Sequence, residues 1–445
     1  MKRTLALDCS GKIGQEVRLC GWVNATRDHG KLVFIDLRDR LGIIQLVGGK
    51  NLRELSLEDV VEVVGTVRER PEEMINPRLA TGKVEIVVEK IRVLAKAAVL
   101  PFDMGKEELN LELPTLLDYR SLTLRHPKIK AIFKVQETIV QAFRQTMRDL
   151  GFVEIQVPTI VATTTEGGAE IFPVKYFDYQ AFLAQSPQFY KQIMVGVFER
   201  VFAVAHAYRA EPSMTTRHLT EYIGLDVEFG FIDNWQEIMD VAEHLTKEIL
   251  KEVEKRNKEE LEMFGITIPE VREKIPRIKL REAQEIIFKR TGRDLREKED
   301  LDPQGEQEIC QLTKEKYGSE LVFITHYPAE KRPMYTFPDP RDPRFTFSFD
   351  LIGRGVEWIT GSQRINDYQQ LVKNIKKWGC NPKNFETPYL QAFKYGMPPE
   401  GGFCLGLERM TQNILGLTNV REASLFPRDI ERIDVRLSTI QPKKS

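Results

Sequence analysis

An arginine and a glutamate stand two positions apart in the stretch Arg209-Ala210-Glu211, and a polar segment with Arg217 and His218 follows. Alternating runs on both sides predict two strands joined by a hairpin loop, and residues i and i+2 of a strand share one face. The planar guanidinium suits phosphate oxygens, while the glutamate could accept from an amine such as that of adenine. A surface hairpin with ordinary ion pairs is the alternative interpretation.

Two other cations could bind a carboxylate. Lys191 follows Gln188 in otherwise apolar and amide company, so it needs an anionic partner if it is buried. Arg364 is a second candidate for the same role. Glu166 and Glu170 flank a glycine pair that indicates a flexible loop, and either could reach an amine, although an exposed turn is an equal interpretation.

Asp350 and Glu357 lie on two alternating runs that could form neighbouring antiparallel strands. Two carboxylates that face a phosphate-binding hairpin could hold Mg²⁺, which favours one or two carboxylates plus phosphate oxygens. An ordinary set of charges on a sheet surface is the alternative. Near the C-terminus, glycines precede Arg409 and the start of a predicted helix, whose dipole and whose arginine would both attract an anion.

The elements that position these residues divide the chain into a predicted barrel over 1–100, a linker or hinge over 101–126 and a second domain over 127–445. Five short strands in the first part are typical of an OB-fold, which often binds single-stranded nucleic acid by stacking bases on aromatic rings. Phe34 could stack on a base and Gln45 could read its edge, although Phe34 could also belong to the core. In the second part, apolar residues at helical spacing predict a helix that begins near Pro127.

Composition limits the class of protein. A chain of 445 residues with 42% hydrophobic and 29% charged residues is typical of a soluble globular protein of two or three domains. The net charge of −1 excludes a generally basic nucleic-acid-binding surface, so any such surface must be local. The five cysteines are scattered, which argues against a zinc ribbon or a disulfide framework. With no signal peptide and no apolar run long enough for a membrane span, we expect a cytoplasmic protein.

Together these motifs resemble a known family. Arg209-Ala210-Glu211 with Thr216-Arg217-His218-Leu219 is similar to motif 2 of class II aminoacyl-tRNA synthetases, and Gly406-Leu407-Glu408-Arg409 is similar to motif 3. The helix from Pro127 and the strand that ends at Pro158 resemble motif 1, the dimerisation element. The N-terminal barrel, Gln188 to Lys191, the loop around Glu166 and the segments around Asp350 and Arg364 most resemble aspartyl enzymes of the archaeal type.

The resemblance implies an α+β protein, with an OB-fold anticodon-binding domain and a six-stranded antiparallel catalytic sheet flanked by helices. It implies a homodimer with two reaction steps. L-aspartate attacks the α-phosphate of ATP, with Mg²⁺ present, to give aspartyl-adenylate and pyrophosphate. The 3′ end of tRNA(Asp) then takes the aspartyl group, and tRNA(Asn) is open as a second acceptor.

The resemblance also implies roles by matched position. Arg209 and Arg409 are the expected catalytic residues, and Phe34 and Gln45 are expected to bind the anticodon. The expected ATP-binding residues are Arg209, Glu211, Arg217, His218, Leu219, Glu357, Gly406, Leu407, Glu408 and Arg409. The expected aspartate-binding residues are Glu166, Gln188, Lys191, Arg209, Thr360 and Arg364. The expected metal ligands are Glu357, Thr360 and Asp350.

The sequence departs from the family pattern at three places, namely Pro212 to Met214, Trp358 and Asn366. Lys191 favours aspartate over asparagine, because an acid is distinguished from its amide by a cation and not by size. An asparagine–tRNA ligase stays open as an alternative. A second alternative is a synthetase paralogue that binds RNA or a small ligand without aminoacylating tRNA.

Overall fold

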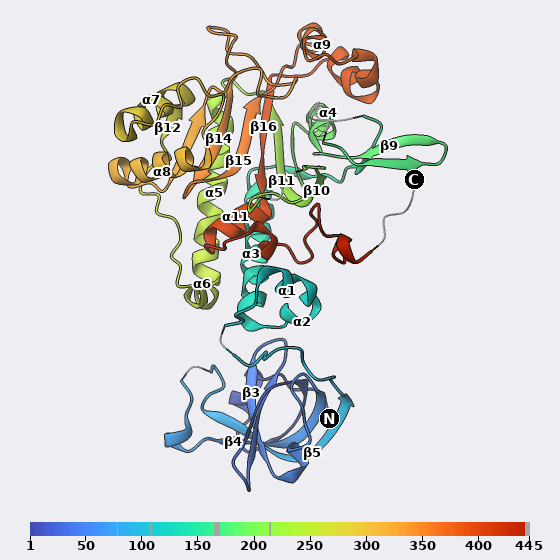
Figure 1. Ribbon diagram of the computed structural model, residues 1–445, viewed down its shortest axis with the longest axis vertical. Coiled ribbons are helices and arrows are strands. Elements are labelled where there is room, and N and C mark those ends of the chain that lie inside the picture. The colour runs from blue at the N-terminus through green and yellow to red at the C-terminus, as the bar shows by residue number, and fades with distance from the viewer. Residues whose placement is uncertain (78, 107, 164–169, 213–214, 441–445) are drawn as a thin grey trace. The chain divides into compact units, whose positions relative to one another are not determined.

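The computed structural model describes residues 1–440 except 78, 107, 164–169 and 213–214. The chain forms two compact units, Met1–Glu112 and Leu113–Ser445 (Figure 1). The segment 101–126, expected to be a linker, is divided by this boundary. Its second half forms the short helices α1 (Leu113–Asp118) and α2 (Arg120–Thr123), which belong to the larger unit.

The first unit is a closed five-stranded barrel with the strand order β1-β2-β3-β5-β4, which confirms the predicted OB-fold. Buried and less buried residues alternate along the strands, because successive side chains point to opposite sides of the barrel wall. Aliphatic residues such as Val33, Ile35 and Leu37 fill the interior. The strands are β1 (Glu16–Asp28), β2 (Val33–Arg38), β3 (Ile43–Gly48), β4 (Val60–Glu69) and β5 (Val84–Ala95).

The second unit is built on an eight-stranded sheet of order β12-β13-β14-β15-β16-β11-β10-β6. The six inner strands are antiparallel, as expected, but the sheet is mixed because the short edge strands β12 and β6 pair in parallel with β13 and β10. The strands are β6 (Val153–Glu154), β10 (Arg200–Tyr208), β11 (Glu221–Gly230), β12 (Arg277–Lys279), β13 (Leu321–Thr325), β14 (Ser348–Gly353), β15 (Val356–Gln363) and β16 (Glu400–Gly406).

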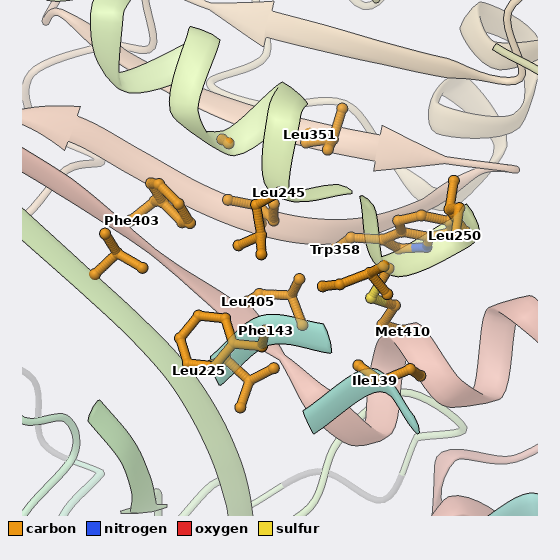
Figure 2. Packing of buried hydrophobic residues seen from close by; sticks show 14 of the residues in the cluster. Ile139, Phe143, Leu225, Leu245, Leu250, Leu351, Trp358, Phe403, Leu405 and Met410 are labelled. Carbon is orange, nitrogen blue, oxygen red and sulfur yellow. The ribbon is translucent and has the colours of Figure 1, made fainter. Parts of the chain in front are cut away.

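Helices α3 (Pro127–Asp149), α5 (Gln236–Arg256) and α11 (Leu407–Ile414) supply apolar side chains to one core with the sheet. Figure 2 shows Phe143 of α3, Leu245 of α5 and Met410 of α11 packed with Leu225 and Leu405 of the sheet. Since side chains alternate along a strand, residues next to this core layer, such as Asp226 and Cys404, point to the opposite face. That face carries the candidate site.

Two elements are short for a local reason. Helix α5 is followed by a separate helix α6 (Lys258–Phe264), because Asn257 between them has a non-helical backbone (φ −116°, ψ 33°). The strand that was expected to end at Pro158 is only the two residues of β6, since Val153 and Glu154 alone pair with β10. The length of a strand is set by its pairing partner, which its own sequence does not show.

The remaining elements surround the sheet (Figure 1). A small sheet of order β7-β9-β8 precedes α4, the helix that carries Lys191. No helix among the described residues is long and apolar enough to cross a membrane. These elements are β7 (Ile160–Val161), β8 (Pro173–Tyr176), β9 (Tyr179–Leu183), α4 (Gln188–Phe198), α7 (Leu280–Thr291), α8 (Pro303–Tyr317), α9 (Tyr368–Lys377), the π-helical turn η5 (Glu386–Leu390) and α10 (Gln391–Lys394).

Candidate active site

A cavity lies on the face of the sheet opposite the core. Its empty volume is about 600 Å³, counting the space open to solvent. Helix α4, five strands of the sheet and the loop that contains Arg332 contribute to its wall. Five of the predicted site residues line this one cavity: Gln188, Lys191, Arg209, Thr360 and Arg364.

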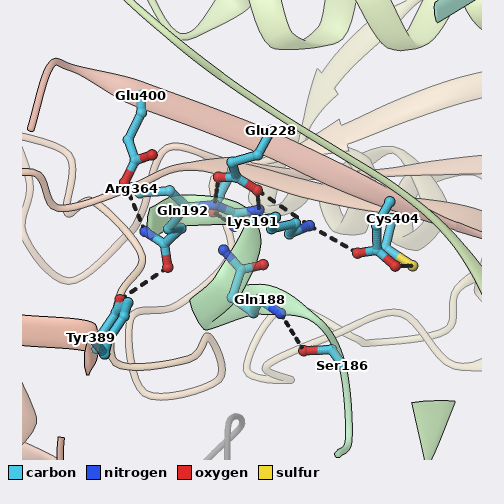
Figure 3. A network of polar contacts seen from close by, with 11 residues as sticks. Ser186, Gln188, Lys191, Gln192, Glu228, Arg364, Tyr389, Glu400 and Cys404 are labelled. Carbon is cyan, nitrogen blue, oxygen red and sulfur yellow. Dashed lines mark hydrogen bonds and ion pairs between the residues drawn. The ribbon is translucent and has the colours of Figure 1, made fainter. Parts of the chain in front are cut away.

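Lys191 is the most deeply buried cation of the cavity, with 2% of its side chain exposed. Its Nζ donates to Asp226 Oδ1 at 2.9 Å and lies 3.2 Å from Glu228 Oε2 (Figure 3). Burial alone would lower the pKa of Lys191, but Asp226 and then Glu228 raise it above its usual value. The ammonium therefore stays charged, which makes it a permanent cation in a site that is poor in water.

Arg364 completes this arrangement from the end of β15. Its Nε donates to Glu228 Oε1 at 2.7 Å and its Nη1 donates to Ser362 Oγ at 2.5 Å. Burial opposes ionisation of Glu228, but Arg364 and Lys191 outweigh it and lower the pKa of that carboxyl. One carboxylate thus holds both cations in place, so that their free donor directions are fixed before a ligand arrives.

Asp226 and Glu228 have room because glycines stand beside them, Gly224 on the same strand β11 and Gly402 on the neighbouring strand β16. A Cβ atom on Gly224 would lie 2.6 Å from Asp226 Oδ2, and one on Gly402 would collide with Glu228 Oε2. Either contact would force the carboxylate to move. The two carboxylates therefore occupy space that only glycine leaves open.

Arg209 enters the cavity just beyond β10. Its guanidinium carbon lies 5.7 Å from the centroid of the Tyr222 ring, which restricts the orientation of the planar group. Its positive charge contributes to lowering the pKa of Glu357, after Arg409, Thr360 and Arg332. Arg209 therefore lines the same cavity as Lys191 and Arg364 and acts electrostatically on Glu357 of β15.

A second group of cations lies around Glu357. Arg409 Nη1 is 3.1 Å from Glu357 Oε1, which also accepts from Thr360 Oγ1 at 2.8 Å. Arg217 Nη1 donates to Glu306 Oε2 at 2.6 Å, and its Nη2 donates to the carbonyl of Gly355 at 3.1 Å. Burial raises the pKa of Glu306 to about 7 despite this contact. These half-buried arginines could exchange their carboxylate partners for phosphate oxygens.

The other predicted nucleotide residues differ in how they are placed. His218 Nε2 lies 3.5 Å from Glu211 Oε2 at the base of the hairpin loop. Glu408 turns inward, where its carboxylate accepts from the backbone N–H of Ile223 at 3.0 Å, and burial raises its pKa to about 7. Leu219 and Leu407 are buried, so their side chains are not exposed to a ligand, and Gly406 precedes the first turn of α11.

Asp350 and Glu357 are brought together, because Asp350 pairs in register with Thr360 on the adjacent strand. Asp350 Oδ2 accepts from Arg332 Nη2 at 2.7 Å, while its buried Oδ1 has no partner among the described residues. Burial, and then the Glu357 carboxylate, raise the pKa of Asp350. Over the described ranges no three His, Cys, Asp or Glu side chains cluster as metal ligands. The donor set suits a cation that takes its remaining ligands from phosphate oxygens.

Sequence reasoning missed four residues of the site. Asp226 and Glu228 were recognised as part of a strand, but not as partners of Lys191; their i, i+2 spacing placed both on one face and was the available signal. Arg332 lies in a stretch without regular periodicity, and Glu400 follows two prolines. Glu166 falls outside the described residues, whereas Gln188 lines the cavity with its buried Nε2 unpartnered in the described part of the chain.

The predicted anticodon residues lie on the barrel. Phe34 is half-buried on β2 and makes an edge contact with the His29 ring, with centroids 5.6 Å apart. Gln45 is buried, and both ends of its amide already have a partner. Its Nε2 donates to Glu85 at 2.8 Å and its Oε1 accepts from Arg27 at 3.2 Å. These contacts fix the orientation of the amide on the barrel wall.

Comparison with known proteins identifies the family. The family described as tRNA synthetases class II (D, K and N) matches residues 112–430, and the OB-fold nucleic acid binding domain matches residues 17–94. The chain is a class II tRNA synthetase. The two matched ranges follow one another along the synthetase, so the resemblance seen in its motifs is confirmed over most of the chain.

Individual relatives match the synthetase over almost its full length and almost their own. The aspartate–tRNA(Asp/Asn) ligase of Deinococcus radiodurans is 44% identical over 97% of this chain and 99% of its own. The aspartate–tRNA(Asp) ligase of Pyrococcus furiosus is 41% identical over 94% and 96%. Among solved structures, the asparaginyl-tRNA synthetase from Pyrococcus horikoshii complexed with asparaginyl-adenylate has a TM-score of 0.87 at 33% identity, covering 97% of this chain and 99% of its own.

Proposed function

We propose that this synthetase is an aspartate–tRNA ligase, which activates L-aspartate with ATP and transfers it to tRNA(Asp). The observation that carries the proposal is the buried pair Lys191 and Arg364 in one cavity with Arg209. Relatives named as aspartate–tRNA ligases at 40–44% identity support the same substrate.

The charge of the cavity favours an acidic amino acid over its amide. Four cations, Lys191, Arg209, Arg332 and Arg364, line the cavity, whereas Asp226 is the one acidic residue of the described lining. An amino acid with a side-chain carboxylate suits this cationic lining better than a neutral one. The alternative, asparagine, brings no net charge and leaves these cations without a matching anion.

The mechanism needs positioning and charge stabilisation, not a protein nucleophile. Lys191 and Arg364 hold the side-chain carboxylate of aspartate, and Gln188, with Glu166, holds its amine. Arg209 bridges the reacting carboxylate and the α-phosphate, where negative charge builds up as the phosphoanhydride bond breaks. Glu211 accepts from the adenine amine, while Arg217, His218 and Arg409 hold the outer phosphates.

A magnesium ion fits the unpartnered oxygen of Asp350 and the neighbouring Glu357 and Thr360. When bound, it would screen the charge of ATP and orient its phosphates. Arg409 would then leave Glu357 for a phosphate oxygen, so that the carboxylate becomes available to the metal. The two events are coupled, because one carboxylate serves both partners.

The barrel is the proposed anticodon-binding domain, with Phe34 stacking on a base and Gln45 reading its edge. Three relatives at 42–44% identity are named for both tRNA(Asp) and tRNA(Asn), which favours the wider acceptor range. Asn24 is a candidate determinant: its Oδ1 accepts from Arg38 at 2.7 Å, which fixes the side chain on β1. Charging of both tRNAs by the wild type and by an Asn24→Ala variant tests this point.

We also propose a cytoplasmic homodimer. Exposed apolar side chains on the edge strand β6 and at the end of α4 support self-association: Val153, Val197 and Phe198 are 40%, 61% and 46% exposed. Sedimentation velocity tests the dimer, and a Val197→Glu variant should shift the population toward monomer.

Aspartate-dependent exchange of pyrophosphate into ATP is the experiment that tests the activity. We expect exchange with aspartate and little with asparagine at equal concentration. Exchange that depends on asparagine would establish the alternative amide specificity. No exchange with any amino acid, together with retained tRNA binding, would instead establish a paralogue that no longer aminoacylates.

A further inference from the structure

Glu400 is a fully buried carboxyl group in the same polar network as Glu228 and Arg364. It lies at the start of β16, and its Oε1 accepts from Gln192 Nε2 of α4 at 2.9 Å (Figure 3). The amide oxygen of Gln192 accepts in turn from Tyr389 Oη at 2.9 Å. None of these three side chains has a role in the mechanism described above.

The strand register places Glu400 beside the carboxylate that holds both cations. Glu400 pairs with Gly230 while Glu228 pairs with Gly402, so the two glutamates lie diagonally on the same face of adjacent strands. The backbone carbonyl of Glu400 accepts from the backbone N–H of Arg364 at 2.9 Å. Glu400 is thus tied to the strand end that presents the Arg364 guanidinium.

Glu400 is not paired with a cation in the described part of the chain. Arg364 and Lys191 both pair with Glu228, and Glu400 Oε2 has no hydrogen-bond partner among the described residues. In a buried site, an ionised carboxylate that lies next to a second carboxylate and has one oxygen without a hydrogen bond raises the free energy of the folded state. The neutral acid avoids most of this cost. The geometry therefore favours the protonated form.

The charged and titratable groups around Glu400 come from every element packed against it. They are Glu228 on β11, Lys191 on α4, Arg364 at the end of β15 and Tyr389 in η5. Burial, and then the Glu228 carboxylate, raise the pKa of Glu400 well above its usual value, while Gln192, Arg364 and Lys191 oppose this shift only in part.

We propose that Glu400 acts as a neutral acid that preserves the cationic character of the amino-acid pocket, and that its proton sets the preference for aspartate over asparagine. Glu400 is a positioning residue in this proposal, since it acts on the substrate through Arg364. The inference rests on the proposed aspartate specificity. Loss of the proton would place a second negative charge beside Arg364 and leave its guanidinium shared between Glu228 and Glu400.

The expected effect falls on the acidic substrate alone. Ionisation of Glu400 should raise the aspartate KM at least about tenfold, because like charges a few ångströms apart repel strongly in a buried site. Inhibition by asparagine, which carries no side-chain charge, should stay within about twofold. A purely structural role would instead change both together.

The first test follows stability and needs no substrate. Glu400→Gln keeps the shape and the neutral state at every pH, and Glu254→Gln, at an exposed position on α5, is the matched control. If Glu400 is neutral in the folded protein, its carboxyl ionises only when the wild type unfolds, and this favours unfolding increasingly as the pH rises above about 5. E400Q has no such proton to release, so its free energy of unfolding should exceed that of the wild type by a margin that grows with pH. A constant gap, or one that favours the wild type near neutral pH, would overturn the proposal.

The second test follows pyrophosphate exchange of the full-length wild type and E400Q from about pH 6 to pH 9.5. At neutral pH we expect aspartate KM values within about threefold of each other, because both residues are uncharged. Toward alkaline pH the wild-type KM should rise above that of E400Q, while titration of the substrate itself affects both enzymes equally.

Parallel pH profiles of the aspartate KM, or a large rise in KM for E400Q at neutral pH, would refute the role of Glu400 in specificity. No aspartate-dependent exchange by the wild type would refute the proposed function instead, with the stability test still reporting on Glu400.

Discussion

The same kinds of charged residue are used differently in the cavity and around Glu357, two places that we call the amino-acid end and the nucleotide end of the candidate site. At the amino-acid end, the side chains of Lys191 and Arg364 are 2% and 6% exposed and share the Glu228 carboxylate. At the nucleotide end, Arg217 and Arg409 are 25% and 27% exposed, and each pairs with a different glutamate. Burial thus separates a fixed cluster of charges from a set of ion pairs open to solvent.

This difference matches the role that we propose for each end. Selecting an acid over its amide requires cations that cannot relax, because a mobile cation would adapt to either ligand. Binding a polyphosphate requires cations that can change partners, and the arginines of the nucleotide end are paired with Glu306 and Glu357 in the structure. Four substitutions test whether the two ends really differ, and they are given from the largest expected effect to the smallest.

Lys191→Leu should abolish aspartate activation and also destabilise the protein. The variant leaves Asp226 without its cation in a buried site, and removing one partner of a buried ion pair typically costs about 3–5 kcal/mol. We expect exchange activity to fall at least about a thousandfold. Pyrophosphate exchange and urea unfolding measure the two effects, with the exposed Lys255→Leu on α5 as the control. Unchanged turnover would remove the argument for the cation.

Arg409→Gln should impair nucleotide binding without a comparable loss of stability. Its pair with Glu357 is partly exposed and worth at most about 1 kcal/mol, whereas a lost phosphate contact should raise the ATP KM about a hundredfold. The aspartate KM measured at saturating ATP should change little. A loss of stability as large as that of Lys191→Leu would show that both ends are equally fixed.

Glu306→Gln should show whether ionisation of Glu306 controls how strongly Arg217 is held away from ATP. Burial raises the pKa of Glu306 to about 7, so this carboxyl becomes protonated as the pH falls through neutrality and Arg217 loses its ionic partner. The wild-type ATP KM should therefore decrease about two- to fivefold between pH 8 and pH 6, and E306Q should show the lower value at both. Steady-state kinetics at the two pH values measure this, and an unchanged pH dependence in E306Q would contradict it.

Tyr389→Phe should have the smallest effect. It removes only the hydroxyl that donates to Gln192 behind the amino-acid end, and a single buried hydrogen bond is worth about 1 kcal/mol. The aspartate KM should stay within about twofold, because the cations keep their own carboxylate partner. Denaturant unfolding detects the loss of stability. A large rise in the aspartate KM would mean that Tyr389 and Gln192 also help to fix the positions of Lys191 and Arg364.

The sequence allowed prediction of those elements whose pattern is local. The alternation through Leu225 and Val227 predicted β11, and the apolar spacing after Pro127 predicted α3, because both signals reflect one face packed on the core. The resemblance extended this to residues such as Lys191 and Arg364, which do line one cavity. Their roles toward substrate and tRNA stay predictions.

Pairings between distant segments could not be predicted in the same way. Lys191 was expected to keep its charge for a ligand, but it lies between Asp226 and Glu228, which reach it from another element. Nothing local to a strand tells which helix covers its polar face. Glu400 shows the same limit: its burial follows from the register of β16 against β11, and a glutamate after two prolines has the local character of an exposed turn.

The absence of a side chain at Gly224 and Gly402 has a consequence for engineering the enzyme. An alanine at Gly402 would displace the Glu228 carboxylate and, with it, the guanidinium and ammonium groups that it orients. If the proposed roles hold, amino-acid choice therefore depends partly on positions that have no side chain. A library confined to substrate-contacting residues would overlook them, whereas a redesign that accepts a bulkier amino acid has to keep both glycines unchanged.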